Sequence, residues 1–208
     1  MYFKFCHKYP RYSNTGIYLE RCSALVAYVS NDLRPRHRLR RHSLATLGAF
    51  QRDGFLVLPE ILASAEIEEL RRVTDRFVDN ARNVPANDEV YDLEESHSLD
   101  EPRVRRIKTP HLRDPEYARA ARHPGIVEVL RDLWGMVRFD TGKLNMKSAG
   151  YGAPVEWHQD WAFYPHTNDD LAAVGIMLDD CEMENGPMMV IPGSHQGLSG
   201  ADIRPSWP

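Results

Sequence analysis

The stretch VEWHQDW, residues 155–161, carries the most informative pattern in the chain. If this stretch is a β-strand, its side chains alternate between two faces, so His158 and Asp160 point the same way. An imidazole nitrogen and a carboxylate oxygen side by side can take two adjacent positions on one metal ion. A second histidine from a distant strand would complete the two-histidine, one-carboxylate set of Fe(II) oxygenases. The competing interpretation is a surface histidine beside an aspartate, because His-x-Asp alone is a weak motif.

The sequence around this stretch indicates β-structure. Short apolar runs are separated by turn residues, and the runs lie at 137–139, 143–148, 157–161, 172–178 and 188–191. Asn185-Gly186, between the last two runs, is a hairpin signal. We therefore expect antiparallel strands that form a barrel or jelly roll.

Helices are expected between residues 43 and 135, before these strands. Ser64 is a candidate N-cap for a helix whose apolar residues recur every three or four positions. Asp114-Pro115 marks the start of another helix. Residues 55–58 are an apolar run typical of a buried strand, and residues 81–102 are polar and acidic, as in a loop. The expected fold class is mixed α+β, with N-terminal helices packed on the β-structure.

The start of the chain differs in charge from the rest. Residues 1–42 hold nine Lys and Arg against two acids, and residues 43–208 hold 17 against 28. The acidic body argues against a nucleic-acid-binding protein, which needs a basic face. We interpret residues 1–42 as a basic, poorly structured extension that precedes a single domain at 43–208. A transit peptide and a non-native start are alternatives that the sequence does not separate.

No apolar run approaches the roughly 20 residues that span a bilayer, so we expect no membrane segment. The cysteines are Cys6, Cys22 and Cys181, a set that makes neither a disulfide framework nor a zinc-binding spacing. A reducing compartment fits this pattern, and we expect a cytoplasmic protein.

Several motifs follow one another in a specific order. They are FQRDGFLVL at 50–58, His-x-Asp at 158–160, NGP at 185–187 and MMVIPGSH at 188–195. In this order they resemble the phytanoyl-CoA dioxygenase family over roughly residues 44–198. The resemblance implies a double-stranded β-helix core, Fe(II), 2-oxoglutarate as co-substrate, O₂, and usually the hydroxylation of a small molecule.

The resemblance assigns roles to individual residues. His158 and Asp160 match the first two iron ligands. Asn145 lies where the family lines the 2-oxoglutarate pocket, and its amide could donate to a carboxylate oxygen; a solvent-facing polar residue is the alternative. Lys108 lies where the family places a basic contact to the co-substrate, although a solvated charged face also explains it. Ile176 replaces a bulky aromatic residue that some members carry near the co-substrate.

Two later histidines are not expected at the metal. The resemblance places His195 in the turn that closes a strand, and His166 lies in a polar loop. The family's distal histidine, and an arginine that pairs with 2-oxoglutarate, would come beyond Pro208. We therefore expect an oxygenase domain without its C-terminal strands, which forms little succinate by itself. The alternative to a dioxygenase is a truncated or degenerate, inactive β-barrel fragment or a binding module. Related halogenases lack the carboxylate ligand, so Asp160 favours hydroxylation.

Overall fold

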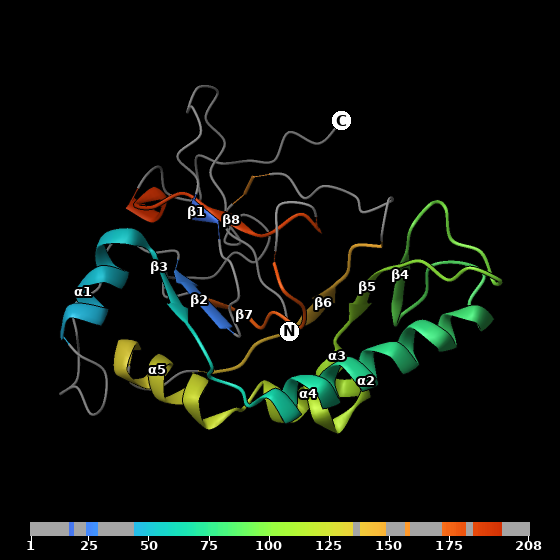
Figure 1. Ribbon diagram of the computed structural model, residues 1–208, viewed down its shortest axis with the longest axis horizontal. Coiled ribbons are helices and arrows are strands. Elements are labelled where there is room, and N and C mark those ends of the chain that lie inside the picture. Colours follow the sequence, from blue (N-terminus) through green and yellow to red (C-terminus); the bar gives the residue numbers. More distant parts are fainter. Residues whose placement is uncertain are drawn as a thin grey trace.

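A layer of helices lies along one side of the strands (Figure 1). The computed structural model describes residues 17–18, 24–28, 44–134, 138–148, 157–158, 172–181 and 185–196. The helices are α1 (Leu44–Asp53), α2 (Ser64–Asn80), α3 (Pro110–Arg113), α4 (Pro115–Ala120) and α5 (Pro124–Trp134), with 3₁₀ turns at Ala81–Asn83 and Ser194–Gln196. The strands are β1 (Ile17–Tyr18), β2 (Ala24–Tyr28), β3 (Phe55–Leu58), β4 (Tyr91–Leu93), β5 (Val104–Lys108), β6 (Lys143–Asn145), β7 (Ala172–Gly175) and β8 (Met189–Val190).

All the described strands pair in antiparallel fashion. One sheet has the order β3-β2-β7, a second has the order β4-β5-β6, and β1 pairs with β8. The expected mixed class of helices and antiparallel strands is therefore confirmed, whereas the expected order of helices first and strands afterwards is not, since β1 to β5 precede or alternate with the helices.

The strand prediction was wrong in detail. β7 and β8 pair with β2 and β1, so Asn185-Gly186 does not close a hairpin between them. Residues 138–139 and 157–158 are not in strands, because among the described residues no partner strand forms a ladder with them. The loop expected at 81–102 contains β4, whose ladder with β5 supplies its backbone partners.

Two short strands lie within residues 1–42, where the sequence predicts little structure. β2 sits between β3 and β7, with Val26 opposite Leu56 on one side and Val174 on the other. Backbone hydrogen bonds on both sides stabilise an extended segment that local sequence does not reveal, so the expectation was wrong for β1 and β2. The division into an extension and a domain that begins at residue 43 stays a prediction.

Helix starts follow the expected chemistry at one site and depart from it at another. Asp114 caps α4 as predicted: its Oδ1 accepts a hydrogen bond from the Glu116 N–H at 2.9 Å. At α2 the capping residue is Ala63, and Ser64 is already helical. Glu66 Oε2 accepts from the Ala63 N–H at 2.8 Å, so a carboxylate at the positive end of the helix satisfies the N–H of the capping residue, and no side chain caps the helix in the way expected of Ser64.

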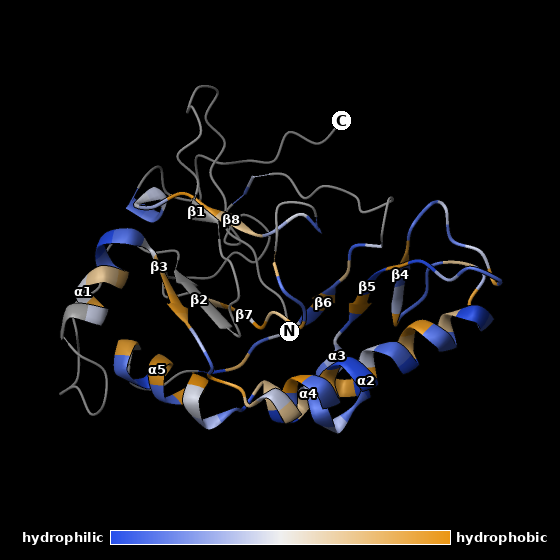
Figure 2. Cartoon of the chain, viewed as in Figure 1, coloured by the Kyte–Doolittle hydropathy of each residue, from blue (hydrophilic) through white to orange (hydrophobic). Residues whose placement is uncertain are grey.

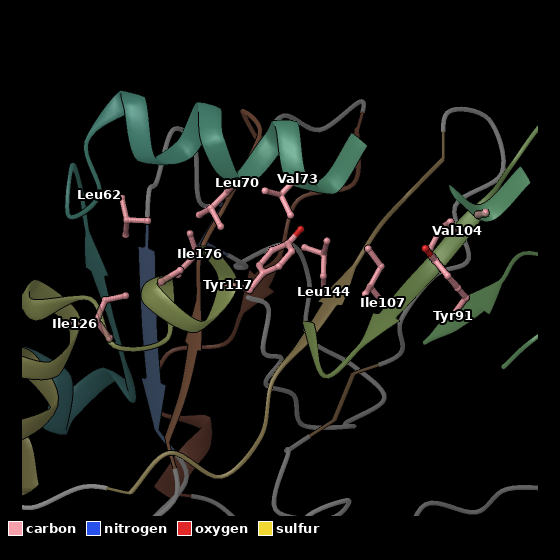
Figure 3. Close-up of a cluster of buried hydrophobic side chains, with 12 residues drawn as sticks. Leu62, Leu70, Val73, Tyr91, Val104, Ile107, Tyr117, Ile126, Leu144 and Ile176 are labelled. Atoms are coloured by element: carbon pink, nitrogen blue, oxygen red, sulfur yellow. The ribbon is translucent and has the colours of Figure 1, made fainter. Parts of the chain in front are cut away.

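One hydrophobic core joins the helices to both three-stranded sheets. Figure 3 shows side chains of α2 and α4 pointing toward those of the strands. The fully or nearly fully buried members are Leu62, Leu70, Val73, Ala81, Tyr91, Val104, Ile107, Tyr117, Ala120, Ile126, Leu144 and Ile176. Because the cluster draws on α2, α4 and three strands of the second sheet, burial of apolar area holds this part of the fold together.

A second cluster packs α1 and α5 against β3. It contains Leu47 and Phe50 of α1, Leu58 of β3, and Val129 and Leu133 of α5. Figure 2 shows hydrophobic and hydrophilic stretches alternating along α2 and α5, as amphipathic helices require. Among the described residues, no helix has the length and apolar character that a bilayer crossing needs.

A buried hydroxyl pair lies inside the main core. The Thr74 hydroxyl donates to the Leu70 carbonyl oxygen at 2.7 Å and contacts the Tyr117 hydroxyl. Since the threonine has a single hydroxyl proton, Tyr117 is the donor to Thr74. Burial raises the pKa of Tyr117 to about 12.

The end of α1 is held by a distant turn. Gly54 has φ +80°, and its N–H donates to the Phe50 carbonyl at 2.8 Å, as at a glycine helix terminus. The Gly193 N–H donates to the Asp53 carbonyl at 2.8 Å. His195 Nε2 lies 2.9 Å from the Gln51 carbonyl oxygen, and a Cβ added to Gly54 would lie 2.2 Å from His195 Nδ1. Glycine is therefore required at position 54 for its conformation and for the close approach of the histidine ring.

Gly54→Ala tests this packing. We expect a loss of more than about 2 kcal/mol in the free energy of unfolding, measured by urea denaturation, because alanine is strained at positive φ and collides with His195. Gly48→Ala is the matched control: it lies inside α1 with no atom within 4 Å of the added Cβ. We expect it to be neutral or to gain up to about 1 kcal/mol. A Gly54→Ala protein as stable as the Gly48→Ala protein would contradict the packing.

Tyr117→Phe tests the hydroxyl pair through pH. In the unfolded chain a tyrosine ionises near its usual pKa of about 10, whereas in the folded chain the pKa of Tyr117 is about 12. Stability from this group is therefore complete below pH ~10 and is lost as pH rises through the folded pKa. Between pH 9 and pH 11.5 we expect the wild type to lose about 2 kcal/mol more than Tyr117→Phe in urea unfolding. If the free energy of unfolding depended on pH equally in the two proteins, the raised pKa of Tyr117 would be contradicted.

Candidate functional site

A row of polar side chains crosses the second sheet. Arg106 of β5 lies directly opposite Asp92 of β4 and Asn145 of β6 in the two strand registers. Arg106 Nε donates to Asn145 Oδ1 at 3.0 Å, and Arg106 Nη1 donates to Asp92 Oδ2 at 3.2 Å. We call these three residues the polar row.

Core packing decides which way the polar row faces. Ile107 and Leu144, the next residues along β5 and β6, are paired with each other and buried against the helices. Since side chains alternate along a strand, Arg106 and Asn145 point to the opposite face. Arg105 has no partner in the β4 ladder, because Asp92 pairs with Arg106 and Leu93 pairs with Val104. This bulge explains why Val104 and Ile107, three residues apart, are both buried.

Lys108 lies beside the polar row and is held by acceptors on and near β4. Its Nζ lies 2.7 Å from Asp92 Oδ1 and donates to the Asp88 carbonyl oxygen at 2.7 Å. The Asp92 carboxylate therefore serves two cations, Arg106 and Lys108. Arg106, Lys108 and Asp92 together carry a net positive charge, which attracts an anion to the neighbouring surface.

A cavity of about 240 Å³ lies next to the polar row. It is lined mainly by β5, residues 144–147, residues 176–181 and residues 185–188, and its polar lining includes Arg105, Arg106, Asn145 and Lys147. On the far side, Lys147 Nζ donates to the Gly186 carbonyl at 2.7 Å. The volume is close to the lower end of the roughly 300–1,000 Å³ of small-molecule sites.

The structure separates the two residues expected to contact 2-oxoglutarate. Asn145 lines the cavity, as the sequence predicts for a pocket residue. Lys108 is not among the described residues that line it, because Asp88 and Asp92 hold its ammonium group on the β4 side. Ile176 is buried and lines the cavity with an aliphatic side chain. The co-substrate roles of Asn145 and Lys108 stay predictions.

Only one of the two expected metal ligands lies within the part of the chain that the structure describes. His158 is half-buried, and Asp160 and His166 lie outside the described residues. Within the described ranges, no three His, Cys, Asp or Glu side chains gather around a common point. The donor types predicted, one imidazole and one carboxylate, suit Fe(II), and the assignment of His158 and Asp160 to the metal stays a prediction.

His195 belongs to the helix-end packing described above. It is buried, and desolvation lowers its pKa, so the neutral ring donates through Nε2 to the Gln51 carbonyl. This use of the ring fits the prediction that His195 lies in a turn with a structural role.

The family model described as phytanoyl-CoA dioxygenase (PhyH) matches residues 50–205. The chain belongs to the phytanoyl-CoA dioxygenase family. The resemblance drawn from the motifs is therefore confirmed. All the residues of the polar row and of the cavity lie inside the matched segment.

Family members with assigned activities support this result. The chain is 36% identical over 145 residues to a probable alpha-ketoglutarate-dependent hypophosphite dioxygenase of Stutzerimonas stutzeri, covering 69% of the chain and 50% of the relative. It is 37% identical over 162 residues to an L-proline trans-4-hydroxylase of Streptomyces griseoviridis, covering 75% and 57%. The chain thus spans about half the length of these relatives.

A solved structure shares the fold. The crystal structure of EctD from S. alaskensis with bound Fe matches with a TM-score of 0.55 and 23% sequence identity, over 71% of the chain and 52% of that structure. At this identity the likeness concerns the fold alone.

Sequence reasoning missed two members of the polar row. Arg106 reads as part of a solvated charged run, and Asp92 falls in the stretch taken as a loop. The available signal was the spacing of two between Arg106 and Lys108, which places both on one face of a strand. Asp92 had no such signal, because a strand of three residues in an acidic segment has no recognisable period.

Proposed function

We propose that this chain forms part of an Fe(II)- and 2-oxoglutarate-dependent dioxygenase that hydroxylates a small molecule. The observation that carries the proposal is the family membership, together with a cavity beside a cationic polar row inside the matched segment. The named relatives are dioxygenases or hydroxylases, and two of the names specify alpha-ketoglutarate dependence or proline hydroxylation. We further propose that the β-structure is a double-stranded β-helix and that the protein is cytoplasmic.

In this proposal each residue has a role in binding the metal or the co-substrate. His158 and Asp160 would hold the iron. Asn145 would donate through its amide to a carboxylate oxygen of 2-oxoglutarate, and Lys108 would add positive charge near it. Iron bound together with 2-oxoglutarate would activate O₂, which would supply one oxygen atom to succinate as 2-oxoglutarate loses CO₂ and the other to a substrate C–H bond, giving an alcohol. The buried face formed by Ile176 and its neighbours would exclude water.

The substrate is proposed only as a class. The relatives are named for hypophosphite, an inorganic anion, and for L-proline, an amino acid. Both are small and charged, and the cavity here combines cations on β5 and at Lys147, just after β6, with Asp179 and Asp180 on another lining segment. A small, polar substrate therefore fits better than a nucleic acid or a membrane lipid.

The second candidate is an inactive β-barrel fragment or binding module. The coverage of about half of each relative is the observation in its favour. The two candidates differ in whether O₂ consumption depends on 2-oxoglutarate and on Asp160.

The test uses the full-length protein that carries these residues, purified without oxygen and supplied with Fe(II), 2-oxoglutarate and O₂. We expect succinate formation that falls at least about 100-fold in His158→Ala and in Asp160→Ala, because each removes a metal ligand. His166→Ala, a nearby histidine without an expected ligand role, is the matched control and should keep its activity. With a substrate found by screening in chloride buffer, the product should be an alcohol.

Two outcomes would contradict the proposal. A chlorinated product would overturn the hydroxylase assignment. Succinate formation that persists in Asp160→Ala, or that is absent from the wild type while its fold is intact, would favour the inactive module.

A further inference from the structure

The contact between Arg106 and Asn145 fixes the orientation of an amide group. A guanidinium only donates hydrogen bonds, so the group of Asn145 that meets Arg106 Nε must be its oxygen. The distance of 3.0 Å between Nε and Oδ1 agrees with this polarity. The contact with Arg106 therefore distinguishes the oxygen of the Asn145 side chain from its nitrogen, which are otherwise easily confused.

The opposite end of the amide is left to donate. Among the described residues, no hydrogen bond is made by the Asn145 NH₂ group, and Asn145 lines the cavity. An NH₂ group offers two donors and no acceptor. A ligand group that accepts hydrogen bonds, such as a carboxylate, is therefore matched here, whereas an ammonium group is not.

Asp92 holds the arginine in the position that this requires. It lies opposite Arg106 in the strand register and accepts from Nη1, so the guanidinium is fixed at two of its nitrogen atoms. Lys108 is held by the same carboxylate and by Asp88. Asp92 thereby fixes two cations of β5, while the NH₂ group of Asn145 remains as a donor at the cavity.

We propose that Arg106, held by Asp92, is a positioning residue that keeps the Asn145 NH₂ group available to the carboxylate of the co-substrate. The proposal rests on the proposed function, because it takes 2-oxoglutarate as the ligand of Asn145. Arg106 acts through the amide and not by pairing with the ligand itself. Loss of Arg106 would let the amide rotate and present its oxygen, which repels a carboxylate.

The first measurement is the side-chain NH₂ signal of Asn145 in ¹H–¹⁵N NMR spectra, assigned by its loss in Asn145→Ala. We expect this signal to shift when 2-oxoglutarate is added with Zn(II), a diamagnetic substitute for iron. In Arg106→Lys, which keeps the charge but loses the fork of donors, the signal should move before any ligand is added.

The second measurement is the affinity for 2-oxoglutarate by calorimetry. We expect Asn145→Ala and Arg106→Lys each to weaken binding roughly tenfold or more. The double variant should bind no more weakly than Asn145→Ala, because Arg106 acts through that residue. Arg119→Lys is the matched control: it makes the same replacement at an exposed arginine of α4, which pairs with Glu116 and does not line the cavity, and it should change affinity less than about twofold.

The outcomes separate this proposal from the proposed function. If Asn145→Ala weakens binding and Arg106→Lys does not, the positioning role is overturned and the function stands. If Arg106→Lys weakens binding by the same factor with or without Asn145, Arg106 contacts the ligand directly and the proposal is again overturned. If no form binds 2-oxoglutarate, the proposed function fails. The NMR signal without ligand then decides, since an unchanged Asn145 signal in Arg106→Lys would overturn the positioning role.

Discussion

The burial of Ile107 and Leu144 against the helices is the constraint on which the candidate site depends. These two residues are paired across β5 and β6 and belong to the core shared with α2 and α4. A shift of either strand by one residue would exchange the two faces of that strand. Arg106 or Asn145 would then point into an apolar layer, where an unpaired charged or polar group is costly. The hydrophobic core thus holds the polar row on the cavity side.

The first sheet is also held to the helical layer by long-range packing, here at the corner between α1 and β3. β3 follows the tight turn at Gly54, and the turn at Gly193–Gln196 holds that corner through the Asp53 and Gln51 carbonyls. Because α1 packs on α5 while β3 pairs with β2, this corner connects the helical layer to the sheet. Residues about 140 positions apart in sequence meet here. The motif PGSH, at 192–195, therefore has a structural role in this chain.

Local patterns predicted most of the helices and some of the strands. The apolar spacing of α2, the Asp114 cap and the apolar run of β7 are short-range signals, and the structure reproduces them. Asn145, which the resemblance to a family assigns to the 2-oxoglutarate pocket, lines the cavity, and its role there stays a prediction. The strands β1 and β2 were missed because their partners lie far along the chain. The bulge at Arg105 also hid β5, since it breaks the period of two that identifies a strand. Asp92 and Arg106 come together only through the pairing of β4 with β5, and the charged sequence of these strands does not predict that pairing.

The central claim is that the polar row and the His158–Asp160 pair serve one ligand site. The most direct test is a crystal structure of the full-length protein grown without oxygen, with Mn(II) in place of iron and with 2-oxoglutarate. Our account predicts the metal on His158 and Asp160 at ~2.0–2.3 Å, as at other first-row metal sites. It also predicts a carboxylate oxygen of 2-oxoglutarate within ~3.2 Å of Asn145 Nδ2, while Oδ1 stays on Arg106. A metal bound elsewhere, or a 2-oxoglutarate molecule that leaves the Asn145 amide without a ligand contact, would contradict the account.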